Sequence, residues 1–264
     1  MKKRKNISDI KIVFFDVDGT LIDIHEKTMS EKMLVTLKML KERNTILCLS
    51  TGRGPDYLPS FPGIEFDAFV TYNGAYCYDK KEVIFRNTIP KEEVKRILYN
   101  AAAINRAISV ATVNRVAVNG EDEDLIEYFS FGKMKIDPCE NFEELARGEV
   151  YQLAMGCCPE EYDAVMKGVT HAKIVAWWDR AVDIIPATGG KGLGVEKVLE
   201  HYHLSKEQAI AFGDGENDIE MLQAVGLGVA MGNSSNQVKE AADYVCECVE
   251  DDGIYYYCLN HGLI

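Results

Sequence analysis

An apolar segment that ends in two acids constrains the fold of this chain most strongly. Ile12 to Phe15 are apolar at every position, and Asp16, Asp18 and Gly19 follow them. A run without alternation is typical of a strand buried on both faces of a parallel sheet. Two carboxylates at the end of such a strand repel each other and resist burial unless a cation or strong donors compensate. Since open α/β sheets bind ligands at the carboxyl ends of their strands, we expect a metal and a ligand to meet there.

Length and charge limit the class of protein. The 264 residues carry a net charge of −13, and the single dense basic run, residues 2–5, is interpreted as a solvated terminus. A broad nucleic-acid surface needs clustered Lys and Arg, so we expect no nucleic-acid partner. No stretch is apolar for long enough to span a bilayer, and the N-terminal pattern is not that of a secretion signal. Eight cysteines without a Cys-x-x-Cys pair predict free thiols in a reducing cytoplasm.

Hydrophobic periodicity predicts a discontinuous α/β domain. Strands are expected at 12–15, 45–50 and 68–71, and a capping box at 28–31 is expected to open the first helix. The pattern resumes with a helix at 191–203 and a strand at 209–212. We therefore expect a Rossmann-like parallel-sheet core at 1–79 and 186–264, with an inserted α+β cap domain at 80–185. A hairpin is expected at 76–85, across the first boundary.

Polar residues recur where the predicted strands end or the helices begin. They are Asp16 and Asp18, Thr51 and Gly52, Lys191, and Asp214 and Asp218. Alone, each has an ordinary explanation: Lys191 as a solvated helix-start lysine, Asp214 or Asp218 as a helix cap, and Thr51 with Gly52 as a turn. Together, in this order and spacing, they resemble the four motifs of the haloacid dehalogenase (HAD) superfamily. The position of the insert resembles a C2-type cap, and Asn73-Gly74-Ala75 resembles the Cof-type (subfamily IIB) phosphatases.

The resemblance implies a catalytic role for four residues. Asp16 would be the nucleophile that forms an aspartyl-phosphate, and Asp18 would protonate the leaving alkoxide and later take a proton from water. Thr51 and Lys191 would hold and neutralise the phosphoryl oxygens. Further substrate contacts would come from Val17 through its backbone, from the Gly52 N–H and from Asn217. Arg53 is expected to contact either the substrate or the cap, and the sequence leaves both open.

The resemblance also implies Mg²⁺ as cofactor, since magnesium prefers oxygen ligands. Asp16, the backbone carbonyl of Asp18 and Asp214 would be its protein ligands, and Asp218 would support that shell. The expected function is hydrolysis of small phosphorylated metabolites, with sugar phosphates as the leading class. We expect a monomer or a weak homodimer with no membrane partner. A HAD phosphomutase and a regulatory module that binds Mg²⁺ or phosphate without turnover remain the alternatives.

Trp177, Trp178 and Arg180 form a short motif in the expected cap. Aromatic residues favour strands, so the pair could belong to the cap core. The motif could instead face the substrate and set specificity, and the sequence leaves these two interpretations open.

Overall fold

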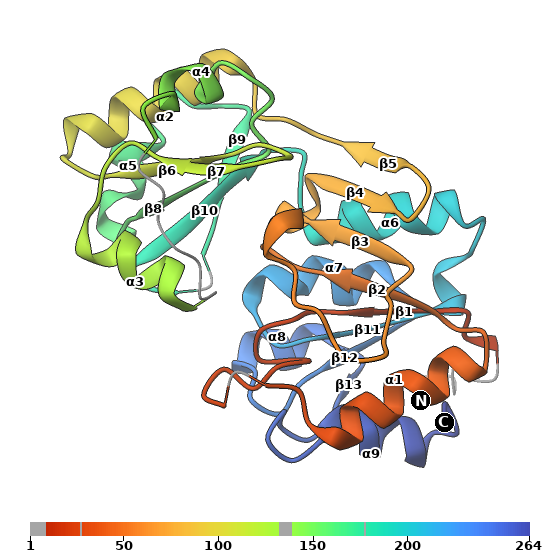
Figure 1. Ribbon diagram of the computed structural model, residues 1–264. Helices are drawn as coiled ribbons and strands as arrows, with labels where there is room; N and C mark the ends of the chain where they lie inside the picture. Colours follow the sequence, from red (N-terminus) through yellow and green to blue (C-terminus); the bar gives the residue numbers. More distant parts are fainter. Residues whose placement is uncertain (1–8, 27, 132–138, 177) are drawn as a thin grey trace.

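The computed structural model describes residues 9–26, 28–131, 139–176 and 178–264, and Figure 1 shows them as two lobes. The larger lobe is built on a sheet whose strands run in the order β13-β12-β11-β1-β2-β3-β4-β5. The smaller lobe, here called the cap, contains a second sheet in the order β7-β6-β8-β10-β9. Within these ranges, the search for a helix long and apolar enough to cross a bilayer finds none.

The core sheet is parallel from β13 to β3, and an antiparallel hairpin completes it. Its strands are β1 (Ile12–Phe15), β2 (Ile46–Ser50), β3 (Ala68–Thr71), β4 (Tyr76–Asp79), β5 (Val83–Arg86), β11 (Ala209–Gly213), β12 (Leu227–Ala230) and β13 (Tyr244–Val245). The central strand β1 lies between β2 and β11, so it has a paired strand along each of its two edges. This confirms the predicted α/β class and places the two acids of the first motif at the centre of the sheet.

Helices cover both faces of the core sheet and bury alternate side chains of its strands. The core helices are α1 (Glu31–Glu42), α6 (Lys191–His201), α7 (Ile219–Ala224), α8 (Asn236–Ala241) and α9 (Gly253–Asn260). Phe15 belongs to the cluster that α1 and α9 complete, and Phe14 belongs to the cluster completed by α6, α7 and α8. Both phenylalanines are fully buried. The unbroken apolar run of β1 is explained by this burial on two faces.

The cap contains an antiparallel sheet with α2, α4 and α5 packed on one face and α3 against the other. Its strands are β6 (Ile108–Ala111), β7 (Val116–Val118), β8 (Gln152–Gly156), β9 (Ala172–Val175) and β10 (Ala181–Pro186), and its helices are α2 (Lys91–Ala103), α3 (Glu123–Phe131), α4 (Phe142–Ala146) and α5 (Tyr162–Val165). Val110, Leu153 and Val182 pack with α2, α4 and α5 in one apolar cluster. Strand alternation turns Ser109, Gln152 and Asp183 to the other face.

Two predicted boundaries differ from the structure. The first helix begins at Glu31, and the hydroxyl of Ser30 accepts its capping bond from the Met33 N–H at 3.0 Å, so Ser30 and not Thr28 is the N-cap. The predicted hairpin is present as β4 and β5, but both strands belong to the core sheet. The expected boundary between residues 79 and 80 falls inside that hairpin, and we propose that the cap begins after β5.

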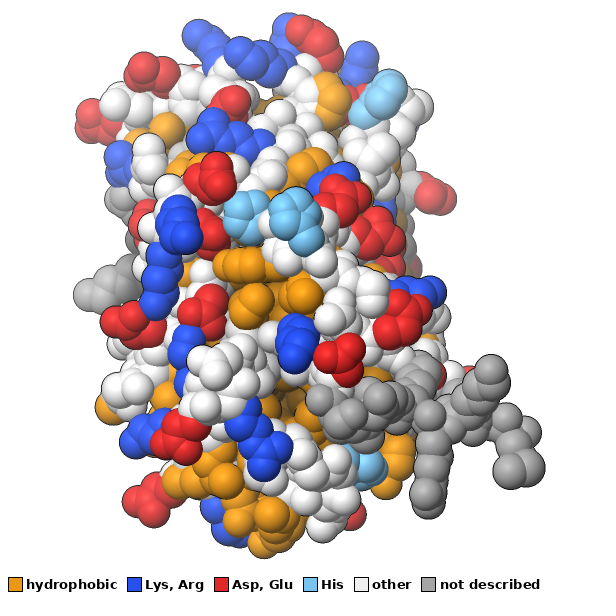
Figure 2. Space-filling view, turned by 90° about the vertical axis from the view of Figure 1, so that its right-hand side faces the viewer, with side chains coloured by type: hydrophobic (Ala, Val, Ile, Leu, Met, Phe, Trp, Pro, Cys, Tyr) orange, Lys and Arg blue, Asp and Glu red, His pale blue; other side chains and the backbone are white. Residues whose placement is uncertain are grey.

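Charged side chains of both signs are interspersed over the face drawn in Figure 2. On this face, the described Lys and Arg side chains form no continuous basic surface. Apolar side chains show between them in small groups, as on most protein surfaces.

Leu37→Ala tests the packing of α1 on the sheet. Leu37 is fully buried in the cluster that contains Phe15, so we expect the free energy of unfolding to fall by about 2–5 kcal/mol in urea denaturation. Val35→Ala is the matched control because Val35 lies on the same helix and is 46% exposed. Its cost should stay within about 0.5 kcal/mol. Equal losses in the two variants would contradict the described packing.

Candidate active site

Three adjacent strands bring the predicted residues to one edge of the core sheet. Phe15, the last residue of β1, is in register with Leu49 of β2 and with Phe212 of β11. The residues that follow these strands therefore leave the sheet at nearly the same level. Asp16, Thr51 and Asp214 all lie at this edge, although 198 positions separate the first of them from the last (214 − 16).

Lys191 is the buried cation of the site. It is the first residue of α6, and its side chain is fully buried. Its Nζ lies 2.6 Å from Oδ1 of Asp16 and 2.6 Å from Oδ1 of Asp218. Burial alone would lower the pKa of Lys191, but the two carboxylates outweigh it and raise this pKa above its ordinary value. Lys191 is therefore charged, and it joins the first and last motifs.

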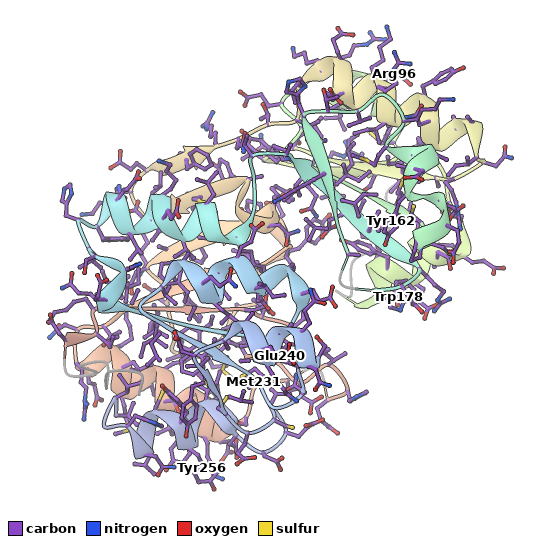
Figure 3. All side chains as sticks on the ribbon, turned by 180° about the vertical axis from the view of Figure 1, so that it is seen from behind. Arg96, Tyr162, Trp178, Met231, Glu240 and Tyr256 are labelled. Atoms are coloured by element: carbon purple, nitrogen blue, oxygen red, sulfur yellow. The ribbon has the colours of Figure 1, made fainter. Side chains whose placement is uncertain are left out.

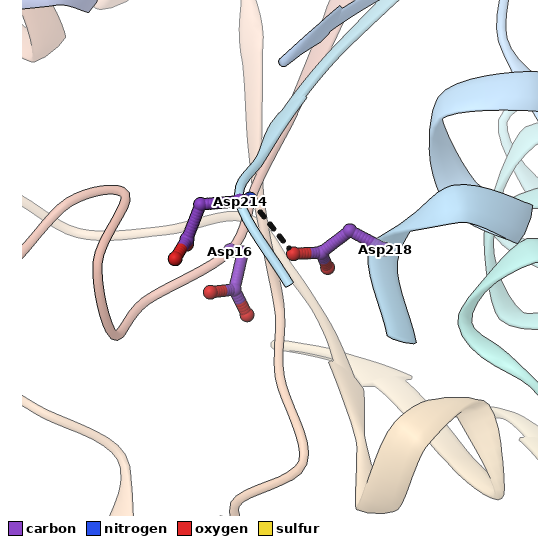
Figure 4. A group of neighbouring side chains, drawn as sticks. All are labelled: Asp16, Asp214 and Asp218. Atoms are coloured by element: carbon purple, nitrogen blue, oxygen red, sulfur yellow. Dashed lines mark hydrogen bonds between the residues drawn. The ribbon is translucent and has the colours of Figure 1, made fainter. Parts of the chain in front are cut away.

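Asp218 fixes the loop that carries Asp214. Its Oδ2 accepts hydrogen bonds from the backbone N–H groups of Asp214 at 3.0 Å and Gly215 at 2.9 Å, the first of which is drawn in Figure 4. Its other oxygen accepts from Lys191. Because both oxygens of Asp218 are engaged, its carboxylate acts here mainly as a support for the Asp214 loop.

Asp214 is held by two residues that sequence reasoning did not assign to the site. The Thr20 hydroxyl donates to Oδ1 of Asp214 at 2.7 Å. The Asn233 amide lies 3.4 Å from its Oδ2 and donates to the Gly19 carbonyl at 2.9 Å. Gly19 has φ +83°, and a Cβ there would lie 2.3 Å from Oδ2 of Asp214, so only glycine permits this approach. Asn233 follows β12, and the strand-end rule that found Asp16 would have found it too.

The site holds more negative than positive charge. Ligand oxygens of Asp16, Asp214 and Asp218 lie within 4.8 Å of one another, and Lys191 is the cation that contacts this group. Burial, and then the neighbouring Asp218, raise the pKa of Asp16 well above its ordinary value, and Lys191 offsets only part of this. The same two causes raise the pKa of Asp214 to about 7. This crowding of buried carboxylates disfavours their charged forms unless a further cation is present.

The donor set fits Mg²⁺. All three side chains offer carboxylate oxygens, the ligands that magnesium prefers, and ligand oxygens lie about 2.1 Å from that ion. Oxygens within 4.8 Å of one another can converge on one such ion with small side-chain adjustments. The expected ligand set also includes the backbone carbonyl of Asp18. The carboxylate of Asp18 faces Arg53 instead.

Asp18 forms an ion pair with Arg53. Arg53 donates from Nε to Oδ2 of Asp18 at 2.8 Å and from Nη2 to Oδ1 at 2.6 Å, and its Nη1 reaches the Tyr57 carbonyl. Thr51 is almost fully buried beside this pair, and its hydroxyl oxygen accepts from the Arg53 N–H at 3.1 Å. Arg53 lines the cavity, so the contact with the substrate stays a prediction. The hydrogen bonds of its guanidinium to described residues stay within the core lobe and do not reach the cap.

A cavity of about 480 Å³ connects these residues to the cap. Core residues Asp16, Asp18, Thr51 and Gly52 line one side of it, and cap residues such as Gln152 line the other. Val17 is buried, and its carbonyl accepts from the N–H groups of residues 21 and 22. The site thus lies between the two lobes, where a ligand contacts both of them.

Asn217 leads to a second group of residues that the sequence did not single out for the site. Its amide donates at 3.1 Å to Oδ1 of Asn73, which in turn contacts Gln152 and Asp183 of the cap. The Asn-Gly pair at residue 73 predicted a turn, and the backbone there does have φ +51°. Its additional role as a link between the lobes depends on the tertiary structure.

The described part of the aromatic motif in the cap, Trp178 and Arg180, does not line the cavity. Figure 3 shows Trp178 at the margin of the cap, and the Arg180 guanidinium lies 4.3 Å from the centre of its ring. Arg180 also pairs with Glu127 at 2.8 Å. Neither Trp178 nor Arg180 is among the described residues that line the cavity. Trp177 lies outside the described residues.

Comparisons with known proteins agree with this geometry. The sequence pattern of the haloacid dehalogenase-like hydrolases matches residues 13–258. A Bacillus subtilis protein named as a candidate phosphatase, YkrA, is 32% identical over 97% of this chain and 99% of its own length. The 5-amino-6-(5-phospho-D-ribitylamino)uracil phosphatase YitU of the same species is 29% identical over 92% of this chain and 94% of its own.

A solved HAD subclass IIB sugar phosphatase superimposes with a TM-score of 0.88 and 29% identity, covering 96% of this chain and 100% of its own. The fold and the acidic site at the sheet edge define a hydrolase that acts on phosphorylated substrates. The chain belongs to the haloacid dehalogenase-like hydrolases, as a phosphatase of the Cof-type, subclass IIB branch.

Mg²⁺ should raise the melting temperature more at high pH than at low pH. The folded pKa of Asp214 is about 7, and its unfolded value is about 3.9. Between these values the folded protein keeps a proton that the unfolded chain has lost, so this contribution to stability is full below the unfolded pKa and fades toward pH 7. Magnesium needs the deprotonated carboxylates, so its own stabilisation is largest above pH 7.

The measurement is thermal unfolding with and without Mg²⁺ at pH 5.5 and pH 8. At 100 times Kd the ion contributes roughly 2.7 kcal/mol, which corresponds to roughly 5–10 °C for a chain of this size. Asp214→Asn should lose most of this increase, and Asp163→Asn, an exposed cap residue, should keep it. An increase that is independent of pH, or unchanged in Asp214→Asn, would contradict the assigned site.

Proposed function

We propose that the protein is a Mg²⁺-dependent phosphomonoester hydrolase that works through an aspartyl-phosphate on Asp16. The observation that carries this proposal is the convergence of Asp16, Lys191 and Asp214 at one sheet edge, beside a cavity open to the cap. Among the hydrogen bonds of the described residues, Oδ2 of Asp16 has no protein partner, so this oxygen is available to attack phosphorus. Lys191 holds the other oxygen and orients the nucleophile.

Two displacements at phosphorus complete the reaction. Asp16 forms a bond to phosphorus as the bond to the leaving oxygen breaks, and Asp18 gives that oxygen its proton. Water then attacks the aspartyl-phosphate, Asp18 takes the proton of the water, and inorganic phosphate leaves Asp16. The Thr51 hydroxyl and the Gly52 N–H hold phosphoryl oxygens during both steps, and Lys191 neutralises their charge. Asp16, Asp214 and the Asp18 carbonyl would hold a Mg²⁺ ion, which would further neutralise the charge of the phosphoryl group.

The ion pair between Asp18 and Arg53 has a consequence for the first step. Both oxygens of Asp18 accept hydrogen bonds from Arg53, at 2.8 Å and 2.6 Å, so neither oxygen can contact a leaving group while this pair is formed. Asp18 must therefore separate from Arg53 before it can donate a proton. A substrate that draws Arg53 toward its own negative charge would release Asp18 at the moment the acid is needed.

The cap wall of the cavity favours a leaving group with a planar ring. Its polar side chains are already hydrogen-bonded within the protein: the Ser109 hydroxyl exchanges bonds with the Ala154 backbone, and Gln152 donates to Asp183. What the described cap wall offers besides these is apolar or aromatic surface, from Val116, Tyr128 and Phe129, and Tyr57 and Leu58 of the core add to it. Sugar phosphates remain the class expected from the sequence, but a bare sugar would find few partners for its hydroxyl groups here.

Asp16→Asn should abolish turnover of p-nitrophenyl phosphate in the presence of Mg²⁺, by at least about 10³-fold in kcat, because an amide cannot form the aspartyl-phosphate. Phosphate release is the measurement, and Asp163→Asn provides a control with the same change of charge far from the nucleophile. Retained activity in well-folded Asp16→Asn would reject the proposed nucleophile. No release from the wild type with any substrate of a phosphate-ester panel would favour the non-catalytic alternative, and phosphate retained on a second hydroxyl of the product would indicate a mutase.

A matched pair of substrates tests the proposed leaving group. Uridine 5′-monophosphate and ribose 5-phosphate share the phosphoribosyl part and differ in the ring. We expect kcat/KM to be at least about tenfold higher for the nucleotide, since contact of a ring with an apolar wall contributes at least one to a few kcal/mol. A preference for ribose 5-phosphate would support the sugar-phosphate class instead and leave the proposed reaction intact.

A further inference from the structure

A buried group of polar side chains joins the cap to the catalytic loops of the core. From the cap come Gln152 on β8, Asp183 on β10 and Tyr128 on α3, and from the core comes Asn73. Three of these residues are almost fully buried: Asn73 is 1% exposed, Gln152 5% and Asp183 1%. Buried polar groups of this kind destabilise a protein unless their bonds are complete, so the partner of each one matters.

Asp183 is the acceptor at the centre of this group. Its Oδ1 accepts from the Tyr128 hydroxyl at 2.6 Å and from Nε2 of Gln152 at 2.9 Å. Its Oδ2 accepts from Nδ2 of Asn73 at 2.9 Å, across the boundary between the lobes. Three donors thus converge on one carboxylate, which is an arrangement that an amide of the same shape cannot satisfy.

The core side of this group belongs to two loops of the active site. Nε2 of Gln152 donates to the Gly52 carbonyl at 3.2 Å, and Nδ2 of Asn73 also donates to Oε1 of Gln152 at 3.0 Å. Oδ1 of Asn73 accepts from Asn217 at 3.1 Å. A Cβ on Gly52 would lie 3.3 Å from Oδ2 of Asp183, so the phosphate loop and the cap carboxylate are almost in contact.

We propose that Asp183 is a positioning residue that latches the cap over the phosphate site and orients the Gly52 and Asn217 loops through Gln152 and Asn73. Separation of the lobes would break three bonds at once: Asn73 to Asp183, Asn73 to Gln152, and Gln152 to the Gly52 carbonyl. Asp183 does not touch the reacting atoms. It acts on the reaction by keeping the closed arrangement populated.

The latch also carries a pH dependence. Burial raises the pKa of Asp183 to about 6, while Tyr128 on α3, Asn73 and the charge of Lys191 on α6 lower it in part. A protonated Asp183 would present a donor where three donors already converge. The latch should therefore hold above pH 6 and weaken below it.

The kinetic part of the test rests on the proposed phosphatase activity, with p-nitrophenyl phosphate and Mg²⁺ as the probe. In Asp183→Asn the amide places an N–H₂ against a donor, so we expect KM to rise about tenfold, while kcat falls less than threefold because bound substrate still draws the cap closed. The ratio of the variant's KM to that of the wild type should narrow below pH 6. Asp163→Asn, an exposed cap substitution of the same kind, should leave both constants unchanged.

A reciprocal exchange separates a latch from a merely structural residue. In the double variant Asn73→Asp with Asp183→Asn, the amide at 183 can donate to the acid at 73 and still accept from Tyr128 and Gln152, while the bond from residue 73 to Oε1 of Gln152 stays lost, so recovery is partial. We expect this variant to recover at least threefold in KM relative to Asp183→Asn. Asn73→Asp alone should have the highest KM of these variants, because it places two carboxylates face to face.

Limited proteolysis at the two connections between the lobes, residues 87–90 and 187–190, gives a readout that does not depend on turnover. We expect faster cleavage in Asp183→Asn than in the wild type, and slower cleavage again in the double variant. Normal KM and cleavage in Asp183→Asn, or no recovery in the double variant, would overturn the latch. A wild type that cleaves no phosphate ester would count against the proposed function alone, and proteolysis would still decide on the latch.

Discussion

The structure depends above all on the contact of one buried ammonium group with two buried carboxylates. Lys191 joins Asp16, at the end of the central strand, to Asp218, in the loop after β11. Burial of this many charges is costly, and removal of the lysine would leave two acids in an apolar interior without a cation. The apolar strand β1, the start of α6 and the loop around Asp214 must therefore form together. Their joint formation also assembles the proposed nucleophile and metal site.

The core and the cap contribute different parts of the site because side chains alternate between the two faces of each strand. The strands β1, β11 and β12 are buried on both faces, and β2 nearly so, which confines chemistry to the strand ends, where Asp16, Thr51 and Asp214 lie. The cap sheet has α2, α4 and α5 on one face, while its other face, which α3 covers in part, carries polar and small side chains such as Asp183 and Ser109. Facing the core, Asp183 binds Gln152 and Asn73, while the Ser109 hydroxyl binds the Ala154 backbone. The substrate is left with a cavity whose remaining surface is largely apolar.

Much of the site could be predicted because its residues share a simple rule. A polar residue directly after a buried strand, or at the first turn of a helix, reaches the carboxyl edge of a parallel sheet, and this located Asp16, Thr51 and Lys191. The helix start at Ser30 was missed by two positions because Thr28 offers the same hydroxyl. The hairpin was found, but not its membership of the core sheet, since strand pairing depends on which neighbour an edge strand meets.

The sequence by itself determined the fold class, the order of the strands and helices, and which acids could approach one another. It could do so because hydrophobic periodicity and the ends of strands depend on residues that are neighbours in the sequence. The tertiary structure decided the partner of each side chain. Arg53 pairs with Asp18, and Asp183 contacts Asn73 from 110 positions away. No local pattern encodes such contacts, since the first depends on which strands are neighbours in the core sheet and the second on how the core and the cap face each other.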